Sequence, residues 1–384
     1  MTKKKVAILG STGSVGTQAA DVCRRFGADV VFVAANRDIK TLEEQIRLFK
    51  PEYCAVADPD AAAKLKAAVA DTDTKVYSGY GSMCSLTEQI GCDIVYNAVS
   101  GKNGLMPTLA ALRSGKTLAL ANKESMVCAG SIVNRVKDEN GAVILPVDSE
   151  HCAIFQCLQN GRENEVKKIL LTASGGPFFG KTKKELEKVT VKEALSHPTW
   201  KMGRKITVDS ATLANKGLEI IEAMYLFGVG FDKIKVLIHR ESIVHSMVEF
   251  KDNCVIAQLS VPDMRYPAQY ALTYPERCDA VTEELDLCRI SKLTFFEPDR
   301  EAFPMLALAE KCAKAAGVIP CVYNAANEVA VELFLKGEID FSGIYGLVSA
   351  VTDGMKNIAD PSLEDILKAD AEARRKAYSF KEIL

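Results

Sequence analysis

A glycine-rich turn near the N-terminus constrains the fold more than any other feature of this sequence. Residues 6–9 read VAIL, residues 10–16 read GSTGSVG, and apolar residues then recur at helical spacing up to residue 26. A strand, a glycine turn and a helix in this order predict a dinucleotide-binding βα unit, because glycine lets the backbone approach a pyrophosphate. The spacing is G-x-x-G-x-x-G rather than the commoner G-x-G-x-x-G, so a plain glycine-rich β–α turn is the alternative.

Strands and helices are expected to alternate through the first third of the chain. The expected strands cover residues 4–9, 29–35, 53–57, 93–99 and 117–121, and the expected helices cover residues 15–26, 40–50, 59–70 and 104–114. This alternation predicts a parallel, doubly wound Rossmann-type sheet within an N-terminal domain of residues 1–150.

The rest of the chain has a different pattern. Strands are expected at 143–147, 167–172, 234–238 and 254–259, with one long helix over 210–227. The sequence therefore predicts a central α/β catalytic domain with a mixed sheet over 151–286 and an extended linker over 287–300. A C-terminal helical bundle of three or four helices is expected over 301–384. Gly317 and Gly337 would end two of its helices, and Asp360 (N-cap) and Pro361 (N1) would begin the last.

Composition excludes several classes of protein. The 384 residues have a formal net charge of −2, so no bulk positive field would attract nucleic acid or an anionic membrane. No apolar stretch reaches the roughly 18 residues of a membrane span. The 12 cysteines include no Cys-x-x-Cys pair, which is typical of thiols in a reducing cytoplasm. A zinc site at His151, Cys152 and Cys157 would lack a second Cys/His pair.

The end of the second expected strand bears on cofactor choice. A fold specific for NAD would place an acidic residue there to bind the ribose hydroxyls, whereas this chain has Ala35, Asn36 and Arg37. An arginine beside neutral residues suits a 2′-phosphate and predicts NADP. Asp38 is the main objection, and its alternative role is the N-cap of the next helix.

Two groups of acidic residues suggest a cation site. Asp148 and Glu150 follow an apolar strand and would share a face if the extended conformation persists. A solvated strand end is the alternative. On the expected long helix, Asn215 and Lys216 precede Glu219 by four and three residues, which would also suit an ordinary surface salt bridge. Glu219 adjoins two isoleucines, so its carboxylate would need a partner.

Two loops suggest ligand binding. Residues 174–177 read SGGP after an apolar strand, which is typical of an anion-binding turn or of a simple turn. Residues 197–203 read HPTWKMG and include Trp200, the only tryptophan of the chain. A tryptophan in a polar loop is expected either to cover a site or to dock the loop on the core.

Taken together, these fragments resemble the 1-deoxy-D-xylulose 5-phosphate reductoisomerase family. They occur in the family's order and span the first two expected domains, and a tail fragment also fits. The matching fragments are GSTGSVG (10–16), ANKES (121–125), LPVDSEH (145–151), SGGPF (174–178), HPTW (197–200), MGRK (202–205), VDSAT (208–212), NKGLE (215–219), HSM (245–247) and NAANE (324–328).

The resemblance implies an activity and its cofactors. The family converts 1-deoxy-D-xylulose 5-phosphate to 2-C-methyl-D-erythritol 4-phosphate in the non-mevalonate isoprenoid pathway. It uses NADPH and a divalent cation, usually Mg²⁺, Mn²⁺ or Co²⁺. The resemblance also implies a homodimer and a mobile lid near 196–205. Whether the skeleton rearranges by retro-aldol and aldol steps or by a direct shift stays open.

The resemblance also assigns site residues. The metal ligands would be Asp148, Glu150 and Glu219. The catalytic residues would be Lys123, Glu150 and His197. The substrate would contact Lys123, Ser149, Glu150, Ser174, His197, Ser210, Asn215, Lys216 and Glu219. NADPH would contact Thr12, Gly13, Ser14, Val15, Asn122, Glu124 and Gly203, and its adenosine phosphate would lie near Ala35, Asn36 and Arg37.

The sequence departs from the family pattern at two places. Residues 35–37 read ANR where Gly-x-Asn is frequent, which leaves the contacts to the adenosine phosphate open. Residues 239–242 read HRES instead of His-Pro-Gln-Ser, a change expected to alter a turn without touching the substrate or metal residues. Two other functions compete with the resemblance. A semialdehyde dehydrogenase would leave the three carboxylates idle, and a non-catalytic NADP sensor would need only the dinucleotide site.

Overall fold

The computed structural model describes residues 3–200 and 202–380, apart from the side chain of Glu163. Contacts divide the chain into two compact units. Unit 1 comprises Met1–Ser125, Val133–Cys152 and Asp263–Glu283, and unit 2 comprises Met126–Ile132, Ala153–Pro262 and Glu284–Leu384. These limits differ from the division at residues 150, 286 and 300, which stays a prediction. Within the described residues, no helix has the length and apolar character that crossing a membrane would require.

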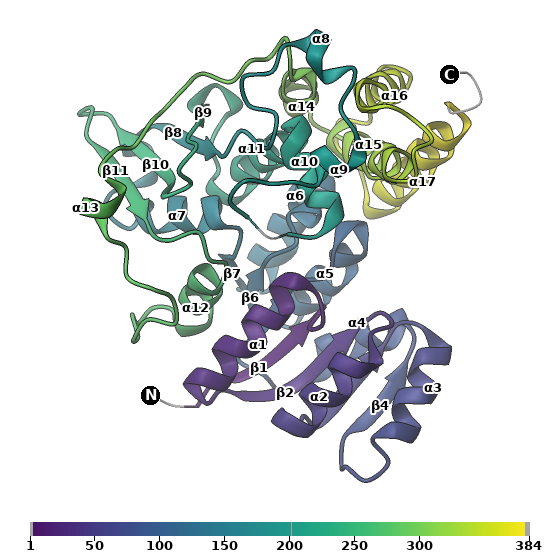
Figure 1. Cartoon of the computed structure of the whole chain (residues 1–384). Coiled ribbons are helices and arrows are strands. Elements are labelled where there is room, and N and C mark those ends of the chain that lie inside the picture. Colours follow the sequence, from purple (N-terminus) through teal and green to yellow (C-terminus); the bar gives the residue numbers. More distant parts are fainter. Residues whose placement is uncertain (1–2, 201, 381–384) are drawn as a thin grey trace. The chain divides into compact units, whose positions relative to one another are not determined.

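Unit 1 contains a seven-stranded sheet in which every neighbouring pair of strands is parallel, as predicted (Figure 1). The strands lie in the order β4-β3-β2-β1-β5-β6-β7. Their bounds are β1 Lys5–Leu9, β2 Asp29–Ala35, β3 Tyr53–Val56, β4 Lys75–Ser78, β5 Ile94–Asn97, β6 Thr117–Leu120 and β7 Val143–Pro146. The order reverses between β1 and β5, and in such sheets ligands bind at the carboxyl ends of the strands beside this point.

Helices accompany this sheet as the alternating pattern predicts. Buried apolar runs form its central strands, as in parallel sheets that are covered on both faces. The helices are α1 Ser14–Phe26, α2 Ile39–Phe49, α3 Pro59–Ala68, α4 Tyr80–Gln89, α5 Leu105–Arg113 and α12 Arg265–Thr273. Two further helices, α6 Lys123–Glu139 and α7 Ser149–Leu158, each contribute residues to both units.

Unit 2 contains a four-stranded sheet and most of the remaining helices. The sheet order is β11-β10-β8-β9, with β8 and β9 parallel and the other pairs antiparallel, so the predicted mixed sheet is confirmed. The strands are β8 Val166–Ala173, β9 Ile234–Ile238, β10 Val244–Phe250 and β11 Val255–Leu259. The longer helices are α10 Arg204–Thr212, α11 Ala214–Phe227, α14 Pro304–Ala315, α15 Ile319–Leu335, α16 Phe341–Asp353 and α17 Leu363–Phe380.

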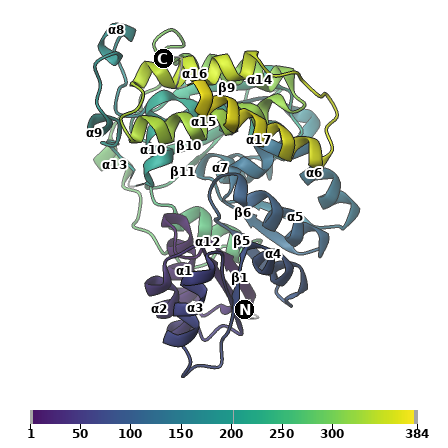
Figure 2. The same ribbon diagram turned by 90° about the vertical axis from the view of Figure 1, so that its right-hand side faces the viewer.

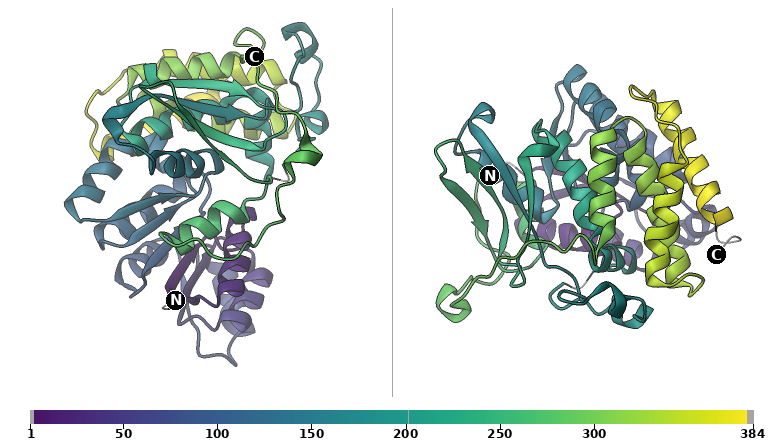
Figure 3. Two further views of the ribbon diagram at one scale, coloured as in Figure 1. Left: turned by 90° about the vertical axis from the view of Figure 1, so that its left-hand side faces the viewer. Right: turned by 90° about the horizontal axis from the view of Figure 1, so that it is seen from above.

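The last four helices form the predicted helical region. Helices α14 to α17 lie side by side in Figures 2 and 3, where α15 packs on both α16 and α17. The glycines expected to end two of these helices, Gly317 and Gly337, both follow helix ends and have positive φ. The expected start of the last helix at Asp360 and Pro361 is wrong. Helix α17 begins at Leu363, because Ser362 and Asp365 exchange reciprocal capping hydrogen bonds.

The long helix expected over 210–227 is also wrong, since it consists of two helices. Leu213 separates α10 from α11 and has a φ of 63°, in the left-handed region that non-glycine residues rarely adopt. The Thr212 hydroxyl accepts a hydrogen bond from the Ala214 N–H at 3.2 Å, which gives the second helix a local N-terminal partner. The break separates Ser210 from Asn215, Lys216 and Glu219, although all four were expected on one helix.

The expected linker over 287–300 contains ordered structure. A short helix, α13 Leu287–Ile290, opens the segment. Further along, Phe296 exchanges two backbone hydrogen bonds with Ile238 at the end of β9. The segment therefore braces the four-stranded sheet of unit 2 in addition to connecting α12 to α14.

Candidate active site

The glycine turn after β1 leaves no room for side chains at two positions. A Cβ atom on Gly10 would lie 2.5 Å from the carbonyl oxygen of Ala98, and one on Gly16 would lie 2.1 Å from the carbonyl oxygen of Gly10. Gly13 is the N-cap of α1 and provides no side-chain hydrogen bond to the helix. The turn lies where the sheet order reverses, so it fits the pyrophosphate of a dinucleotide.

The three residues expected near the adenosine phosphate lie at the end of β2, but one of them already has an ionic partner. Ala35 is the last residue of β2, and Asn36 and Arg37 are exposed. The Arg37 guanidinium forms an ion pair with Asp58 at 2.8 Å while 76% of its side chain stays exposed. Asp38 accepts the Thr41 N–H at 3.1 Å and is the N-cap of α2. The alternative role of Asp38 as a helix N-cap is therefore confirmed. Asp38 is thus no longer a strong argument against NADP.

Asn122 fixes the turn between β6 and α6. Its side-chain oxygen accepts the Ser125 N–H at 3.0 Å, and its amide donates to the carbonyls of Val99 and Gly101 at 2.7 and 2.9 Å. The same amide lies 3.0 Å from a carboxylate oxygen of Glu124. Asn122 is buried and both ends of its side-chain amide form hydrogen bonds. The turn that bears Lys123 and Glu124 is therefore held rigidly.

Asp148 lies in a buried, charged cluster at the end of β7. The Lys123 ammonium lies 2.6 Å from its carboxylate, and the His151 ring lies 3.6 Å away. Burial alone would raise the pKa of Asp148, but Lys123 and His151 hold this pKa well below its usual range. Asp148 is therefore ionised at neutral pH and remains a strong ligand for a cation.

The expected extended conformation of residues 147–150 is wrong. Strand β7 ends at Pro146, and α7 begins at Ser149, so Asp148 and Glu150 do not alternate along a strand. The Asp148 carbonyl accepts the Cys152 N–H at 2.8 Å, as expected at the start of a helix. The Ser149 hydroxyl donates to the Glu150 carboxylate. These carboxylates thus come from a strand-to-helix turn in unit 1.

The loop after β8 in unit 2 forms a tight turn around Ser174. Gly175 and Gly176 have φ of 76° and 64°, which only glycine adopts without strain. A Cβ atom on Gly176 would lie 2.7 Å from the carbonyl oxygen of Ser210, so this turn closely approaches the end of α10. Ser174 and Ser210, which come from separate fragments of the sequence, are thereby brought to one region of unit 2.

His197 contacts this turn in a defined protonation state. Its Nδ1 accepts the N–H groups of Thr199 and Trp200 at 3.1 and 2.9 Å, so the ring hydrogen is on Nε2. Nε2 lies 2.9 Å from the Ser174 hydroxyl oxygen and therefore donates to it. Burial, followed by the nearby Arg240 charge, lowers the pKa of His197 to about 4. The ring is therefore neutral at physiological pH.

Three predicted site residues follow one another along α11. The Asn215 amide and the Lys216 ammonium donate to the two oxygens of the Glu219 carboxylate. Lys216 and Glu219 are 3% and 1% exposed, so the alternative of a surface salt bridge is wrong. A buried ion pair is weak evidence for stability, since desolvation offsets much of its attraction. The arrangement therefore favours a functional role for this cluster.

Helix α10 is held by a second buried carboxylate. Asp209 accepts hydrogen bonds from Lys205 and from the Asn327 amide of α15, both at 2.8 Å. Gly203 is the N-cap of this helix. These contacts fix the helix that includes Ser210, and the matching fragments of the sequence did not reveal this role of Asn327.

Sequence reasoning missed the contacts of Arg240. Its guanidinium donates hydrogen bonds to the carbonyl oxygens of Ser174 and Gly176. The departure from the family pattern at residues 239–242 therefore does touch a predicted substrate residue, contrary to expectation. The only signal in the sequence was the substitution itself.

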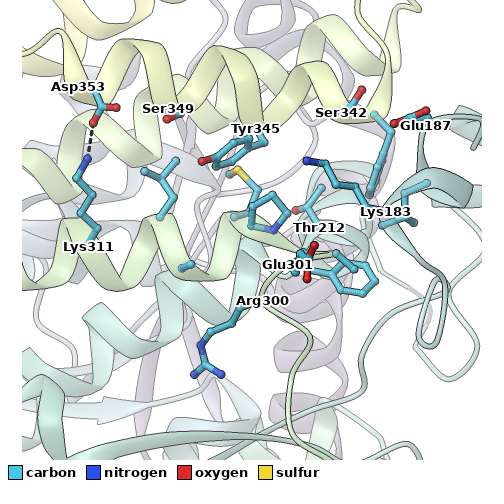
Figure 4. Close-up of a pocket in the computed structure, with 18 residues that line it drawn as sticks. Lys183, Glu187, Thr212, Arg300, Glu301, Lys311, Ser342, Tyr345, Ser349 and Asp353 are labelled. Atoms are coloured by element: carbon cyan, nitrogen blue, oxygen red, sulfur yellow. Dashed lines mark hydrogen bonds and ion pairs between the residues drawn. The ribbon is translucent and has the colours of Figure 1, made fainter.

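Unit 2 also has a cavity of about 530 Å³ (Figure 4). Apolar residues of α14 and α16 line much of it. Two of its cations are paired, Arg300 with Glu310 at 2.8 Å and Lys311 with Asp353 at 2.6 Å. None of the predicted site residues lines this cavity, although Thr212 at the end of α10 does.

Comparison with protein families gives consistent matches along the chain. Models described as 1-deoxy-D-xylulose 5-phosphate reductoisomerase, its C-terminal domain and the DXP reductoisomerase C-terminal domain match residues 6–130, 144–227 and 259–376, respectively. Curated proteins with this name include one from Agathobacter rectalis, 49% identical over 96% of this chain and 97% of its own length. Another, from Phocaeicola vulgatus, is 46% identical over 98% of this chain and 99% of its own length.

Solved structures give the same result. A 1-deoxy-D-xylulose 5-phosphate reductoisomerase from Zymomonas mobilis in complex with NADPH is 40% identical, with a TM-score of 0.93 and full coverage of both chains. A DOX-P reductoisomerase in complex with NADPH, fosmidomycin and magnesium is 38% identical, with a TM-score of 0.94 and coverage of 99% of this chain and 98% of that one. The chain thus belongs to the 1-deoxy-D-xylulose 5-phosphate reductoisomerase family and is an NADPH-dependent oxidoreductase.

Proposed function

We propose that this chain converts 1-deoxy-D-xylulose 5-phosphate to 2-C-methyl-D-erythritol 4-phosphate, using NADPH and a divalent cation, in the non-mevalonate isoprenoid pathway. The observation that carries the proposal is a largely or fully buried carboxylate beside a buried lysine in each unit. Lys123 contacts Asp148 in unit 1, and Lys216 contacts Glu219 in unit 2. The choice of substrate is supported by the match to this family along nearly the whole chain.

The proposed cation ligands are Asp148, Glu150 and Glu219. A set of three carboxylates suits a hard cation such as Mg²⁺ or Mn²⁺ better than zinc, which prefers nitrogen and sulfur ligands. The family resemblance adds Co²⁺ as a further candidate. Magnesium is present in the related complex with fosmidomycin. When bound, the cation would polarise the substrate carbonyl and NADPH would supply the hydride.

NADPH is proposed to bind along the carboxyl edge of the seven-stranded sheet. The glycine turn would receive the pyrophosphate, and residues 35–37 the adenosine phosphate. The residues of this proposed site are Thr12, Gly13, Ser14, Val15, Ala35, Asn36, Arg37, Asn122, Glu124 and Gly203. The cradle formed by Gly10 and Gly16 supports this placement, since side chains there would fill it.

Two sets of side chains are proposed to bind the two ends of the substrate. Lys123, Ser149 and Glu150 would contact the reacting end. Ser174, His197, Ser210, Asn215 and Lys216 would hold the other end, chiefly the phosphate. The Ser174 oxygen accepts hydrogen bonds from His197 and from the Gly176 N–H at 3.2 Å, which leaves its own hydrogen to donate to an anion. His197 is neutral and has one ring hydrogen, on Nε2, which is directed at Ser174, so it would donate to the phosphate by sharing or redirecting this hydrogen.

The loop near 196–205 is proposed to be the lid of this site. Lys201 lies outside the described residues. The Trp200 ring lies edge-on to His245, with ring centroids 6.1 Å apart, and is partly exposed. The backbone N–H of Trp200 donates to Nδ1 of His197, so a movement of this loop would displace the His197 ring at the proposed phosphate site.

We also propose a homodimer in the cytoplasm, with a sugar phosphate as the small-molecule partner and without nucleic acid or membrane partners. The net charge of −2 supports the absence of polyanionic partners. Family resemblance supports the dimer.

The proposed reaction can be tested by following NADPH oxidation at 340 nm. The purified chain should consume NADPH only when 1-deoxy-D-xylulose 5-phosphate and Mg²⁺ or Mn²⁺ are both present, and 2-C-methyl-D-erythritol 4-phosphate should accumulate in equal amount. Turnover of an aldehyde substrate without metal would instead indicate a semialdehyde dehydrogenase. Binding of NADPH without any turnover would indicate a sensor.

Replacing Arg37 with alanine should weaken NADPH binding and leave NADH binding nearly unchanged. A hydrogen bond to a charged group contributes about 1.5–3 kcal/mol, or about ten- to a hundredfold in affinity. The expected loss lies toward the lower end, because Arg37 is exposed and already pairs with Asp58. The measurement is the KM for each cofactor. Arg47→Ala is the matched control, because Arg47 is an exposed arginine of α2 that pairs with Asp71. Equal losses for both cofactors would show that Arg37 does not contact the 2′-phosphate.

A further inference from the structure

The segment of residues 239–242 is anchored directly beside the Ser174 turn. The His239 N–H donates to the Ala173 carbonyl at 2.7 Å, one residue before Ser174. The His239 ring lies 2.8 Å from the Thr294 carbonyl through Nδ1, and its Nε2 accepts two N–H groups at the start of β10. The backbone that bears Arg240 is therefore held at β8, at β10 and at the segment before α14.

The Arg240 side chain is held on two sides. One nitrogen of its guanidinium donates to the carbonyls of Ser174 and Gly176, 66 and 64 residues away in sequence. The guanidinium carbon lies 5.0 Å from the centre of the Phe179 ring, within the range of a cation–π interaction. The Phe179 ring in turn packs on Phe296, with centroids 5.2 Å apart. A planar group clamped in this way acts as a brace.

The Ser174 turn needs a brace because its own residues supply little rigidity. Gly175 and Gly176 are adjacent, both have positive φ, and glycine gains the most conformational freedom when contacts are lost. The Ser174 hydroxyl depends on this turn, since it accepts the Gly176 N–H as well as the His197 ring nitrogen. Any displacement of the two carbonyls would therefore move the hydroxyl.

We propose that Arg240 is a positioning residue for the phosphate end of the substrate. By binding the Ser174 and Gly176 carbonyls, it holds the Ser174 hydroxyl and the His197 ring in the arrangement that receives the phosphate. Its charge also adds a fixed cation beside this turn. The inference rests on the proposed function, which assigns Ser174 and His197 to the phosphate.

The test compares Arg240→Met and Arg240→Lys with two other variants of the full chain. Arg300→Met removes an arginine that pairs with Glu310 elsewhere in unit 2, and Ser174→Ala removes the proposed phosphate ligand itself. We expect Arg240→Met to raise the KM for the substrate and the Kd of fosmidomycin by about tenfold or more, which corresponds to one hydrogen bond to a charged group. The kcat should fall much less, and the Kd of NADPH should not change. Arg240→Lys should restore part of the affinity, because an ammonium can bind one carbonyl at a time.

A double variant separates this inference from the proposed function. If Arg240 acts through Ser174, the losses in fosmidomycin affinity from Arg240→Met and Ser174→Ala should be less than additive in the combined variant. Strictly additive losses, or equal KM values for Arg240→Met and Arg300→Met, would overturn the inference while leaving the proposed function intact. If Ser174→Ala leaves KM unchanged, the assignment of the phosphate site itself fails. Should Arg240→Met not fold, Arg240→Lys and its combination with Ser174→Ala give the same comparison. Trp200 fluorescence on adding fosmidomycin confirms that each folded variant retains the loop.

Discussion

Replacing Glu219 with glutamine is expected to lower kcat/KM by about a thousandfold, because the loss of a charged ligand removes several kcal/mol of charge stabilisation in the transition state. Glutamine keeps the shape of the side chain and can still accept a hydrogen bond from Lys216. Asp148→Asn, at the other unit's carboxylate, should have a similar effect. In both variants the Kd of NADPH should stay nearly unchanged, as measured by fluorescence titration.

The cation itself gives a second readout for this prediction. A ligand that binds only the native state stabilises it by about 2.7 kcal/mol at a hundred times its Kd. Added Mn²⁺ should therefore raise the Tm of the parent protein and raise it much less in Glu219→Gln and Asp148→Asn. Glu332→Gln, at a partly exposed glutamate paired with Lys336 on α15, is the matched control and should respond like the parent. A fully active Glu219→Gln variant with the parent's response to Mn²⁺ would show that Glu219 is not a metal ligand.

Replacing Gly16 with alanine should nearly abolish NADPH binding, with an affinity loss of about a hundredfold or more. The new Cβ atom would lie 2.1 Å from the Gly10 carbonyl oxygen and 2.8 Å from the Ser11 Cα, so the backbone of the turn must move. Overpacking of this kind costs about 1–3 kcal/mol of stability, and the displaced N–H groups lose charged hydrogen bonds of about 1.5–3 kcal/mol each. Both the Tm and the Kd of NADPH should change.

The matched control is Gly81→Ala on α4 in the same unit. A Cβ atom at Gly81 would have no heavy atom within 4 Å, and alanine favours a helix over glycine by about 1 kcal/mol. This variant should be as stable as the parent or more stable, with unchanged NADPH affinity. If Gly16→Ala binds NADPH as tightly as Gly81→Ala does, the turn after β1 does not receive the pyrophosphate.

The elements that the sequence predicted well are those with a strong local signal. The core strands of unit 1 are short apolar runs bounded by turn residues, and β1, β2 and β5 lie within a residue or two of the predicted ranges. Strand β4 was not predicted, because its residues KVYS are mostly exposed at the edge of the sheet and show no apolar run. The break at Leu213 was not predicted either, since leucine gives no sign of a left-handed conformation.

The candidate site divides in the same way. Residue types and their order suggested carboxylates, lysines and an anion-binding turn, and local spacing was enough to pair Asn215 and Lys216 with Glu219. The Arg240 contacts could not be predicted from the sequence. They join residues more than 60 positions apart through backbone carbonyls, which have no sequence signature. The neutral state of His197 likewise depends on burial and on two backbone N–H groups.

The path of the chain through unit 1 has a consequence for biosynthesis. The first helix, α1, packs against α12, and the Lys4 ammonium binds the carbonyls of Leu272 and Tyr274 at 3.3 and 2.8 Å. Unit 1 therefore takes its last segment, Asp263–Glu283, from chain that is made only after all four strands of unit 2's sheet. During synthesis, the face of α1 that packs against α12 therefore stays uncovered until this segment has been made. Unit 1 can therefore complete its fold only after residue 283 has been made, while helices α14 to α17 of unit 2 are still to be made.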